Sequence, residues 1–191
     1  MNVLNHLFYN KLQENPIIAA IRDHTQINAA LQSPSEIIFI LKSDIFNISS
    51  IVDQVHANRK QIYIHMDLIE GLAKDTLAIK YIQQKIRPDG IITTRANLVK
   101  TAKDLNMLVI QRCFVLDHLS LDTGIESINS IKPDAVEILP GIMPRIIKKF
   151  AESTNIPIIA GGLIMNKKDI LQNLQAGAVG ISTSKEEIWY M

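Results

Sequence analysis

The sequence predicts an α/β protein, a compact TIM-like (β/α)8 barrel with minimal loops, formed by residues 1–191 as a single domain. Two observations predict this fold. Eight short apolar runs, rich in β-branched residues, recur along the chain, and most intervals between them carry apolar residues at helical spacing. Strands that alternate with helices in this way build a parallel sheet covered by helices. No stretch has the composition of a linker, so we expect one domain.

Eight repeats favour a closed barrel over an open sheet. The expected strands cover residues 17–21, 37–41, 62–66, 90–94, 108–111, 135–139, 157–160 and 178–182. The helical pattern is clearest over residues 76–86 and 142–150, where apolar residues recur every three or four positions. Typical barrels have about 250 residues, and this chain has 191. Its loops must therefore be short, and an open sheet or a barrel with one degenerate unit remains the alternative.

Two motifs near the C-terminus predict a binding site. Residues 157–164 read P-I-I-A-G-G-L-I, an apolar run that ends in Gly161 and Gly162. Residues 178–184 read A-V-G-I-S-T-S, a second apolar run that ends in Ser182, Thr183 and Ser184. In a barrel, backbone N–H groups and hydroxyls at these strand ends would converge on one anion, so we interpret the pair as a phosphate site. The alternative is that the glycines permit close packing and the hydroxyls cap the last helix.

Polar side chains at other strand ends are candidates for the rest of a ligand. His65 and Asp67 lie two residues apart and would share a face if the strand continued, while Glu70 follows the strand. Glu137 interrupts an apolar strand, and a buried carboxylate there needs a cationic partner or a ligand. Each of these residues has a structural alternative: a hydrogen-bonded pair inside the barrel for the first two, a helix cap for Glu70, and an ion pair for Glu137.

Three arginines follow or end different strands: Arg22, Arg95 and Arg112. The planar guanidinium donates two hydrogen bonds at once to phosphate or carboxylate. We expect at least one of them to contact a ligand and at least one to pair with a carboxylate of the rim.

Basic residues cluster after the sixth and seventh expected strands, at Arg145, Lys148, Lys149, Lys167 and Lys168. Their position near the mouth makes them candidates for contact with RNA, although solvated helix faces carry such residues too. With a net charge of only +1, the protein has no overall positive charge that would attract nucleic acid.

The remaining composition narrows the class of protein. One cysteine, Cys113, excludes an internal disulfide. No apolar stretch reaches the length of a membrane span and no secretory signal is evident, so we expect a cytoplasmic protein. The histidines show no metal-ligand spacing, so we expect no metal. Residues 4–12 are amphipathic and could close the bottom of the barrel or pack on a partner, and we expect a homodimer.

Several motifs, in order along nearly the whole chain, resemble those of one family, the glycerol uptake operon antiterminator regulatory proteins (the GlpP family). They are residues 16–22, 66–72, 88–95, 109–117, 136–141, 157–164 and 182–184. The resemblance implies a small TIM-barrel-like protein that senses glycerol 3-phosphate as an effector, without a cofactor. It also implies binding to the leader mRNA of glycerol-utilisation genes, where the protein suppresses premature termination of transcription.

Two other functions remain open from the residues alone. One is a phosphate-binding TIM-barrel enzyme, such as an isomerase, lyase or phosphodiesterase, in which His65 and Asp67 or Glu137 would be the acid–base pair. The other is a scaffold or partner-binding protein without a phosphorylated ligand. The resemblance carries over no catalytic residue, so we expect a regulator and not an enzyme.

Overall fold

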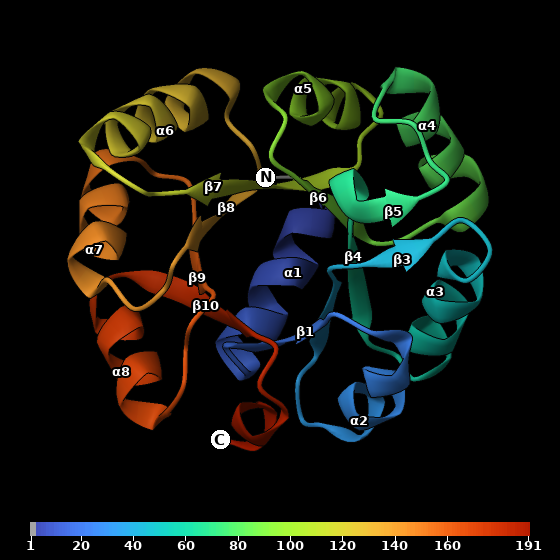
Figure 1. Ribbon diagram of the computed structural model, residues 1–191, viewed down its shortest axis with the longest axis horizontal. Helices are drawn as coiled ribbons and strands as arrows, with labels where there is room; N and C mark the ends of the chain where they lie inside the picture. Colours follow the sequence, from blue (N-terminus) through green and yellow to red (C-terminus); the bar gives the residue numbers. More distant parts are fainter. Residues whose placement is uncertain (1–2) are drawn as a thin grey trace.

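Eight parallel strands close into a barrel in this computed structural model, which describes residues 3–191 and side chains from residue 6 onward (Figure 1). The order around the barrel is β1-β10-β9-β8-β7-β6-β4-β2. The barrel strands are β1 (Ile17–Ile21), β2 (Ile37–Ile40), β4 (Gln61–His65), β6 (Gly90–Thr93), β7 (Leu108–Phe114), β8 (Ala135–Leu139), β9 (Ile158–Gly161) and β10 (Ala178–Thr183). The closed (β/α)8 barrel is thereby confirmed, and the open-sheet alternative is wrong.

All eight expected strands are present, and most bounds agree within a residue. The exception is β7, which was expected to end at Gln111 but continues to Phe114. Arg112 therefore lies inside a strand and not in the loop that follows it. The polar Gln-Arg pair suggested the end of the apolar run, but both side chains are buried within the strand.

Helices cover the outside of the barrel (Figure 1). They are α2 (Ile27–Gln32), α3 (Ile48–Ala57), α4 (Thr76–Tyr81) with its π-helical continuation (Ile82–Ile86), α5 (Ala96–Asp104), α6 (His118–Ile131), α7 (Pro144–Ser153) and α8 (Lys167–Gln175). After β10, the 3-10 helix Glu186–Tyr190 contacts β1 and α2 in the place of an eighth outer helix. Its Trp189 is fully buried and donates from Nε1 to Thr183 O at 2.8 Å. No helix among residues 3–191 is long and apolar enough to cross a membrane.

The barrel interior is apolar at its lower end. Strand residues including Ile18, Phe39, Tyr63 and Ile159 form one buried cluster with Phe8 of α1 (Val3–Glu14). The rings of Phe8 and Tyr63 meet edge to face with centroids 5.1 Å apart. Tyr9 donates to Asp134 O, which directly precedes β8, at 2.6 Å.

Helix α1 therefore closes the end of the barrel at which the strands begin, and Figure 1 shows it lying behind the ring of strands. This confirms the expectation that the N-terminal segment closes the barrel bottom. Leu4, the first residue of the amphipathic stretch, lies outside the residues whose side chains are described.

Two short strands form a separate parallel sheet above the opposite end. Strand β3 (Ser43–Asp44) follows β2, and β5 (Ile69–Glu70) follows β4, with Asp44 paired to Glu70. The C-terminal ends of the barrel strands and the loops that follow them surround this end, which we call the mouth. The β3–β5 sheet covers the side of the mouth that is formed by β2 and β4 (Figure 1).

A candidate anion site and a buried polar layer at the barrel mouth

A cavity of about 370 Å³ lies at the mouth where the chain leaves β9 and β10. Its lining residues are Arg22, Gly162, Leu163, Ile164, Met165, Thr183, Ser184 and Lys185. Strands β9 and β10 are direct neighbours in the barrel, and Gly161 pairs with Ser182. The two predicted phosphate motifs therefore lie side by side and share one cavity.

The loop between β9 and α8 has an unusual backbone. Gly162 has φ +76° and Leu163 has φ +59°, so two successive residues are left-handed. For a bulky residue such as Leu163 this conformation is rare, and such strain persists where the surrounding structure holds it. Gly162 thus eases a turn whose left-handed backbone larger residues rarely adopt.

Hydrogen bonds hold this loop by its carbonyl groups. Gly141 N donates to Gly162 O at 3.0 Å, and Lys185 Nζ donates to Met165 O at 3.3 Å. The hydroxyl of Thr183 lies 3.5 Å from Ile164 O. Among the described residues, by contrast, none accepts a hydrogen bond from the N–H groups of Leu163, Ile164 or Ser184.

Three residues that line the cavity, Leu163, Ile164 and Ser184, therefore have backbone N–H groups without an acceptor, while the carbonyls of Gly162, Ile164 and Met165 already accept hydrogen bonds. Consecutive free N–H groups in a tight turn form a concave site that favours an anion. The hydroxyl of Ser184 and the guanidinium of Arg22 add further donors at the same cavity. This arrangement can hold a phosphate or carboxylate group.

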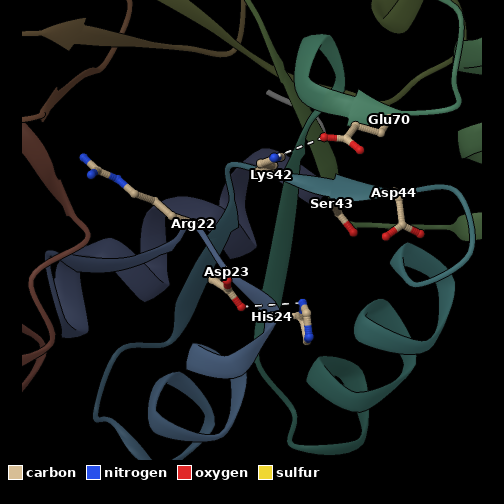
Figure 2. A pocket seen from close by; sticks show the side chains of 7 residues that line it. All are labelled: Arg22, Asp23, His24, Lys42, Ser43, Asp44 and Glu70. Carbon is tan, nitrogen blue, oxygen red and sulfur yellow. Dashed lines mark ion pairs between the residues drawn. The ribbon is translucent and has the colours of Figure 1, made fainter.

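Arg22 also lines a second, outer cavity of about 240 Å³ (Figure 2). The other lining residues are Asp23, His24, Lys42, Ser43, Asp44 and Glu70, most of which are already partnered. Lys42 Nζ lies 3.1 Å from Glu70 Oε1, and Asp23 Oδ1 lies 3.5 Å from His24 Nδ1.

Figure 2 shows the Arg22 side chain extending away from the other six, toward the C-terminal part of the barrel. Within the described part of the chain its guanidinium makes no hydrogen bond and no ion pair. Arg22 is therefore a cation without a protein partner that stands between the two cavities.

Below the mouth, the upper layer of the barrel interior is polar. Residues two apart in a strand share a face, so His65, Arg112, Glu137 and Gly161 point inward above Tyr63, Ile110, Ala135 and Ile159. Ser182, which pairs with inward Ile18 and with Gly161, completes this layer. All four of its side chains are at least nine-tenths buried.

An ion pair occupies the centre of this layer. Arg112 Nε donates to Glu137 Oε2 at 2.7 Å, and the two residues are register partners on β7 and β8. This confirms that Glu137 has a cationic partner. A Cβ added to Gly161 would lie 2.5 Å from Glu137 Oε1, so the carboxylate lies directly beneath the start of the β9–α8 loop.

His65 belongs to the same layer and has a buried ring nitrogen without a hydrogen bond. This nitrogen, Nδ1, lies 4.0 Å from Asp67 Oδ2. Burial, and after it the charge of Arg112, lowers the pKa of His65 to about 4, against the raising effects of Asp67 and Glu137. The imidazole is therefore neutral at pH 7 and can both donate and accept a hydrogen bond.

Asp67, Glu70 and Arg95 have other partners. Asp67 accepts from Thr93 Oγ1 at 2.9 Å and from Thr94 N at 2.7 Å, and so fixes the loop after β6. Arg95 Nε lies 3.7 Å from the same carboxylate. Glu70 is exposed, lies in β5 and pairs with Lys42, whereas α4 is capped by Asp75. The three predicted arginines therefore do not converge on one point.

The predicted basic residues are all exposed on two adjacent outer helices. Arg145, Lys148 and Lys149 belong to α7, and Lys167 and Lys168 begin α8. Lys148 pairs with Glu152 at 3.7 Å. Gly141, two residues before Met143 at the N-cap of α7, bonds to the β9–α8 loop through its N–H and accepts from Asn173 of α8 at 2.6 Å. The helices are thus connected to the anion cavity.

The sequence interpretation missed Lys185 and residues 163–165 as lining of the cavity. Lys185 directly follows the Ser-Thr-Ser run, so extending that motif by one residue would have included it. Leu163 and Met165 carry apolar side chains and gave no sequence signal. Within residues 3–191 no group of three potential metal-ligating His, Cys, Asp or Glu side chains comes together.

Comparison with known proteins gives consistent findings. A model of the family described as glycerol-3-phosphate responsive antiterminator matches residues 17–189. The crystal structure of a glycerol uptake operon antiterminator regulatory protein from Listeria monocytogenes is 34% identical, with a TM-score of 0.89 over 92% of this chain and 95% of that one. A related protein from Thermotoga maritima is 31% identical, with a TM-score of 0.82 over 92% and 98%.

An uncharacterized protein of Escherichia coli, YgcP, is 34% identical over 93% of each chain. The orotidine 5′-phosphate decarboxylase of Pyrococcus horikoshii is 20% identical with a TM-score of 0.67, which shows a shared fold alone.

Proposed function

The chain belongs to the glycerol-3-phosphate responsive antiterminator family, and from this premise we propose that it binds glycerol 3-phosphate at the mouth of its barrel. The phosphate occupies the cavity formed by Gly162, Thr183, Ser184 and Arg22. The observation that carries this proposal is the β9–α8 loop, in which the carbonyls of Gly162 and Met165 are bonded while the N–H groups of Leu163 and Ile164 have no acceptor. A dianionic phosphate supplies the acceptors that these donors lack.

The glycerol end of the effector points down toward the polar layer. Glu137, Arg112 and the neutral His65 present both acceptors and donors there, which suits vicinal hydroxyl groups. Ser182 and Gly161 belong to the same layer and directly precede Thr183 and Gly162, which line the phosphate cavity. Asp67 and Glu70 are less suited to the glycerol hydroxyls, because Asp67 already accepts three hydrogen bonds and Glu70 lies in the outer cavity.

Calorimetric titration with glycerol 3-phosphate tests the effector site. Arg22→Gln removes the unpartnered cation and should weaken binding at least tenfold, because a charge-assisted contact contributes about 1.5–3 kcal/mol. Arg145→Gln is the matched control: it removes an exposed arginine from α7, outside the cavity, and should leave effector affinity unchanged. Equal affinities for the wild type and Arg22→Gln would refute this placement of the phosphate.

We propose that the regulated partner is leader mRNA, bound by the basic residues of α7 and α8. Effector binding can act on those helices because Gly141 and Asn173 bond them to the β9–α8 loop. The effector acts as a switch only if it binds the RNA-competent state more tightly.

An electrophoretic shift assay with the leader of a glycerol-utilisation gene, with and without effector, tests RNA binding. Replacing Lys148, Lys149, Lys167 and Lys168 by glutamine should weaken RNA binding. It should also make the plot of log affinity against log salt concentration less steep, by about one unit of slope for each lysine that contacts a phosphate. The same change should leave effector affinity intact. Binding that is absent at low salt in both conditions contradicts the RNA proposal.

We also propose that the effector is bound without being chemically changed. The strongest candidate base, Glu137, is held in an ion pair with Arg112, and Asp67 already accepts three hydrogen bonds. Phosphorus NMR of glycerol 3-phosphate incubated with the protein should show one unchanged resonance. A new phosphorus signal that disappears in Glu137→Gln would instead establish an enzyme.

A further inference from the structure

Large apolar side chains are exposed at three consecutive strand-to-helix connections of the mouth, counting Phe114 at the end of β7 and Leu119 in the first turn of α6. They are Phe114 (53% exposed), Leu116 (86%), Leu119 (72%), Ile142 (49%), Leu163 (60%) and Met165 (55%). The loops follow β7, β8 and β9, which are direct neighbours in the barrel. We call these six side chains the apolar rim.

Backbone hydrogen bonds join the three loops into one surface. Val115 N donates to Leu139 O at 2.8 Å, which ties the first loop to the end of β8. Gly141 N donates to Gly161 O at 2.6 Å and to Gly162 O at 3.0 Å, which ties the second loop to the third. The rim is therefore a fixed feature of the fold and not a set of independent side chains.

The size of the rim fits a protein interface. With ordinary side-chain areas, the six exposures amount to about 700 Å² of accessible surface, against roughly 800 Å² per partner in a standard interface. Exposed apolar patches on monomers rarely exceed about 600 Å². The rim alone thus supplies nearly the area that a stable dimer buries on each subunit.

The charge of the rim distinguishes between partners. Asp117 is the only charged residue within residues 114–119, 140–143 and 162–165. The nearest cations, Arg22 and Lys185, lie at the edge of the rim in the anion cavity. The six rim side chains themselves offer nothing to the phosphates of RNA, whose binding depends on lysine and arginine. An identical neutral surface is complementary to the rim, because a two-fold axis sets the same patch on both sides.

We infer that the apolar rim pairs with the rim of a second copy of this chain. In this dimer the two mouths face each other, and the basic faces of α7 and α8 stay on the outside. Leu163 and Met165 belong both to the rim and to the lining of the anion cavity. Resting on the proposed function, the dimer therefore also couples to the effector: a ligand that fixes the β9–α8 loop favours the dimer, and dimerisation tightens effector binding by the same factor.

Sedimentation velocity across a micromolar range of protein, with and without glycerol 3-phosphate, tests this inference. The wild type should be a dimer whose dissociation constant falls when the effector is added. Leu116→Glu places a charge at the most exposed rim residue and should raise that constant at least tenfold. Leu77→Glu is the matched control, since Leu77 is 73% exposed on α4 and outside the rim, and it should dimerise like the wild type.

Each outcome separates this inference from the effector proposal. A wild type that stays monomeric while it binds glycerol 3-phosphate overturns the dimer and leaves the effector site standing. If the protein instead forms a dimer that Leu116→Glu disrupts and has no affinity for glycerol 3-phosphate, that result supports dimerisation through the rim and refutes the proposed effector. If Leu116→Glu stays dimeric, or if it weakens RNA binding of a monomeric protein, the rim has another role and the inference is wrong.

Discussion

The Glu137 carboxylate fills the space that a side chain at Gly161 would need, since a Cβ on Gly161 would lie 2.5 Å from Glu137 Oε1. The glycine at this position is therefore required by its neighbour on β8, whereas the turn that follows requires Gly162, which has φ +76°. Gly161 allows the buried carboxylate of Glu137 and the start of the β9–α8 loop to lie close together.

Gly161→Ala should destabilise the protein by about 1–3 kcal/mol, the usual cost of overpacking a filled core. Chemical denaturation measures the change. Gly124→Ala in α6 serves as the control, because its added Cβ would lie 3.3 Å from the ring edge of Phe150 and alanine favours a helix. The control should be neutral or stabilising by up to about 1 kcal/mol. If both variants lost the same stability, contact with Glu137 would not be the cause of the destabilisation by Gly161→Ala.

Breaking the Arg112–Glu137 pair should cost more than replacing it. Arg112→Met leaves a carboxylate unpaired in a residue that is 1% exposed, and about 3–5 kcal/mol of stability should be lost. The double variant Arg112→Met with Glu137→Leu should lose less than the sum of the two single variants. Urea unfolding of all four proteins measures the coupling, and additive losses would mean that the two charges do not depend on each other.

The lowered pKa of His65 predicts a specific loss of stability in acid. In the unfolded chain His65 takes up a proton near pH 6.5, whereas in the folded protein it does so only near pH 4. Below pH 6.5 the unfolded state thus binds more protons, so the free energy of unfolding falls until about pH 4. The contribution is absent above pH 6.5 and reaches about 3 kcal/mol at pH 4.

Unfolding of the wild type and His65→Gln between pH 7 and pH 4 isolates this contribution. The variant should lack the part of the slope that begins near pH 6.5, whatever its stability at pH 7. Parallel curves for the two proteins would show that His65 titrates normally in the folded state.

Phe8 anchors the helix that closes the barrel bottom. Because its ring is fully buried against Tyr63, Phe8→Ala should cost about 3–5 kcal/mol. The neighbouring Leu7 is 47% exposed, and Leu7→Ala should cost far less. If both substitutions had the same small effect on thermal unfolding, α1 would not contribute to the barrel core.

The barrel itself was predictable because strands buried on both faces leave a strong apolar signal. The run Ile17 to Ile21 is buried at every position, and it was found to the residue. The two-residue strands β3 and β5 gave no such signal, since Ser43, Asp44 and Glu70 are polar and at least partly exposed. Their pairing depends on where the ends of β2 and β4 lie in space.

The candidate site could be predicted only in part, for a related reason. Strand order brings the Gly-Gly and Ser-Thr-Ser motifs together, and a barrel fixes that order, so their shared cavity followed from the fold. The partners of the charged side chains could not be predicted in this way. Arg112 and Glu137 pair because β7 extends further than its apolar run, and Asp67 is held by Thr93 and Thr94 across a loop.

The anion cavity combines Arg22, near the start of the chain, with residues 162–185, near its end. During synthesis the arginine leaves the ribosome long before Thr183 and Ser184 are added. In a nascent chain this cavity is therefore incomplete until β10 inserts between β9 and β1. With the effector placed in this cavity as proposed, a chain that ends before β10 lacks part of the lining and is not expected to bind it.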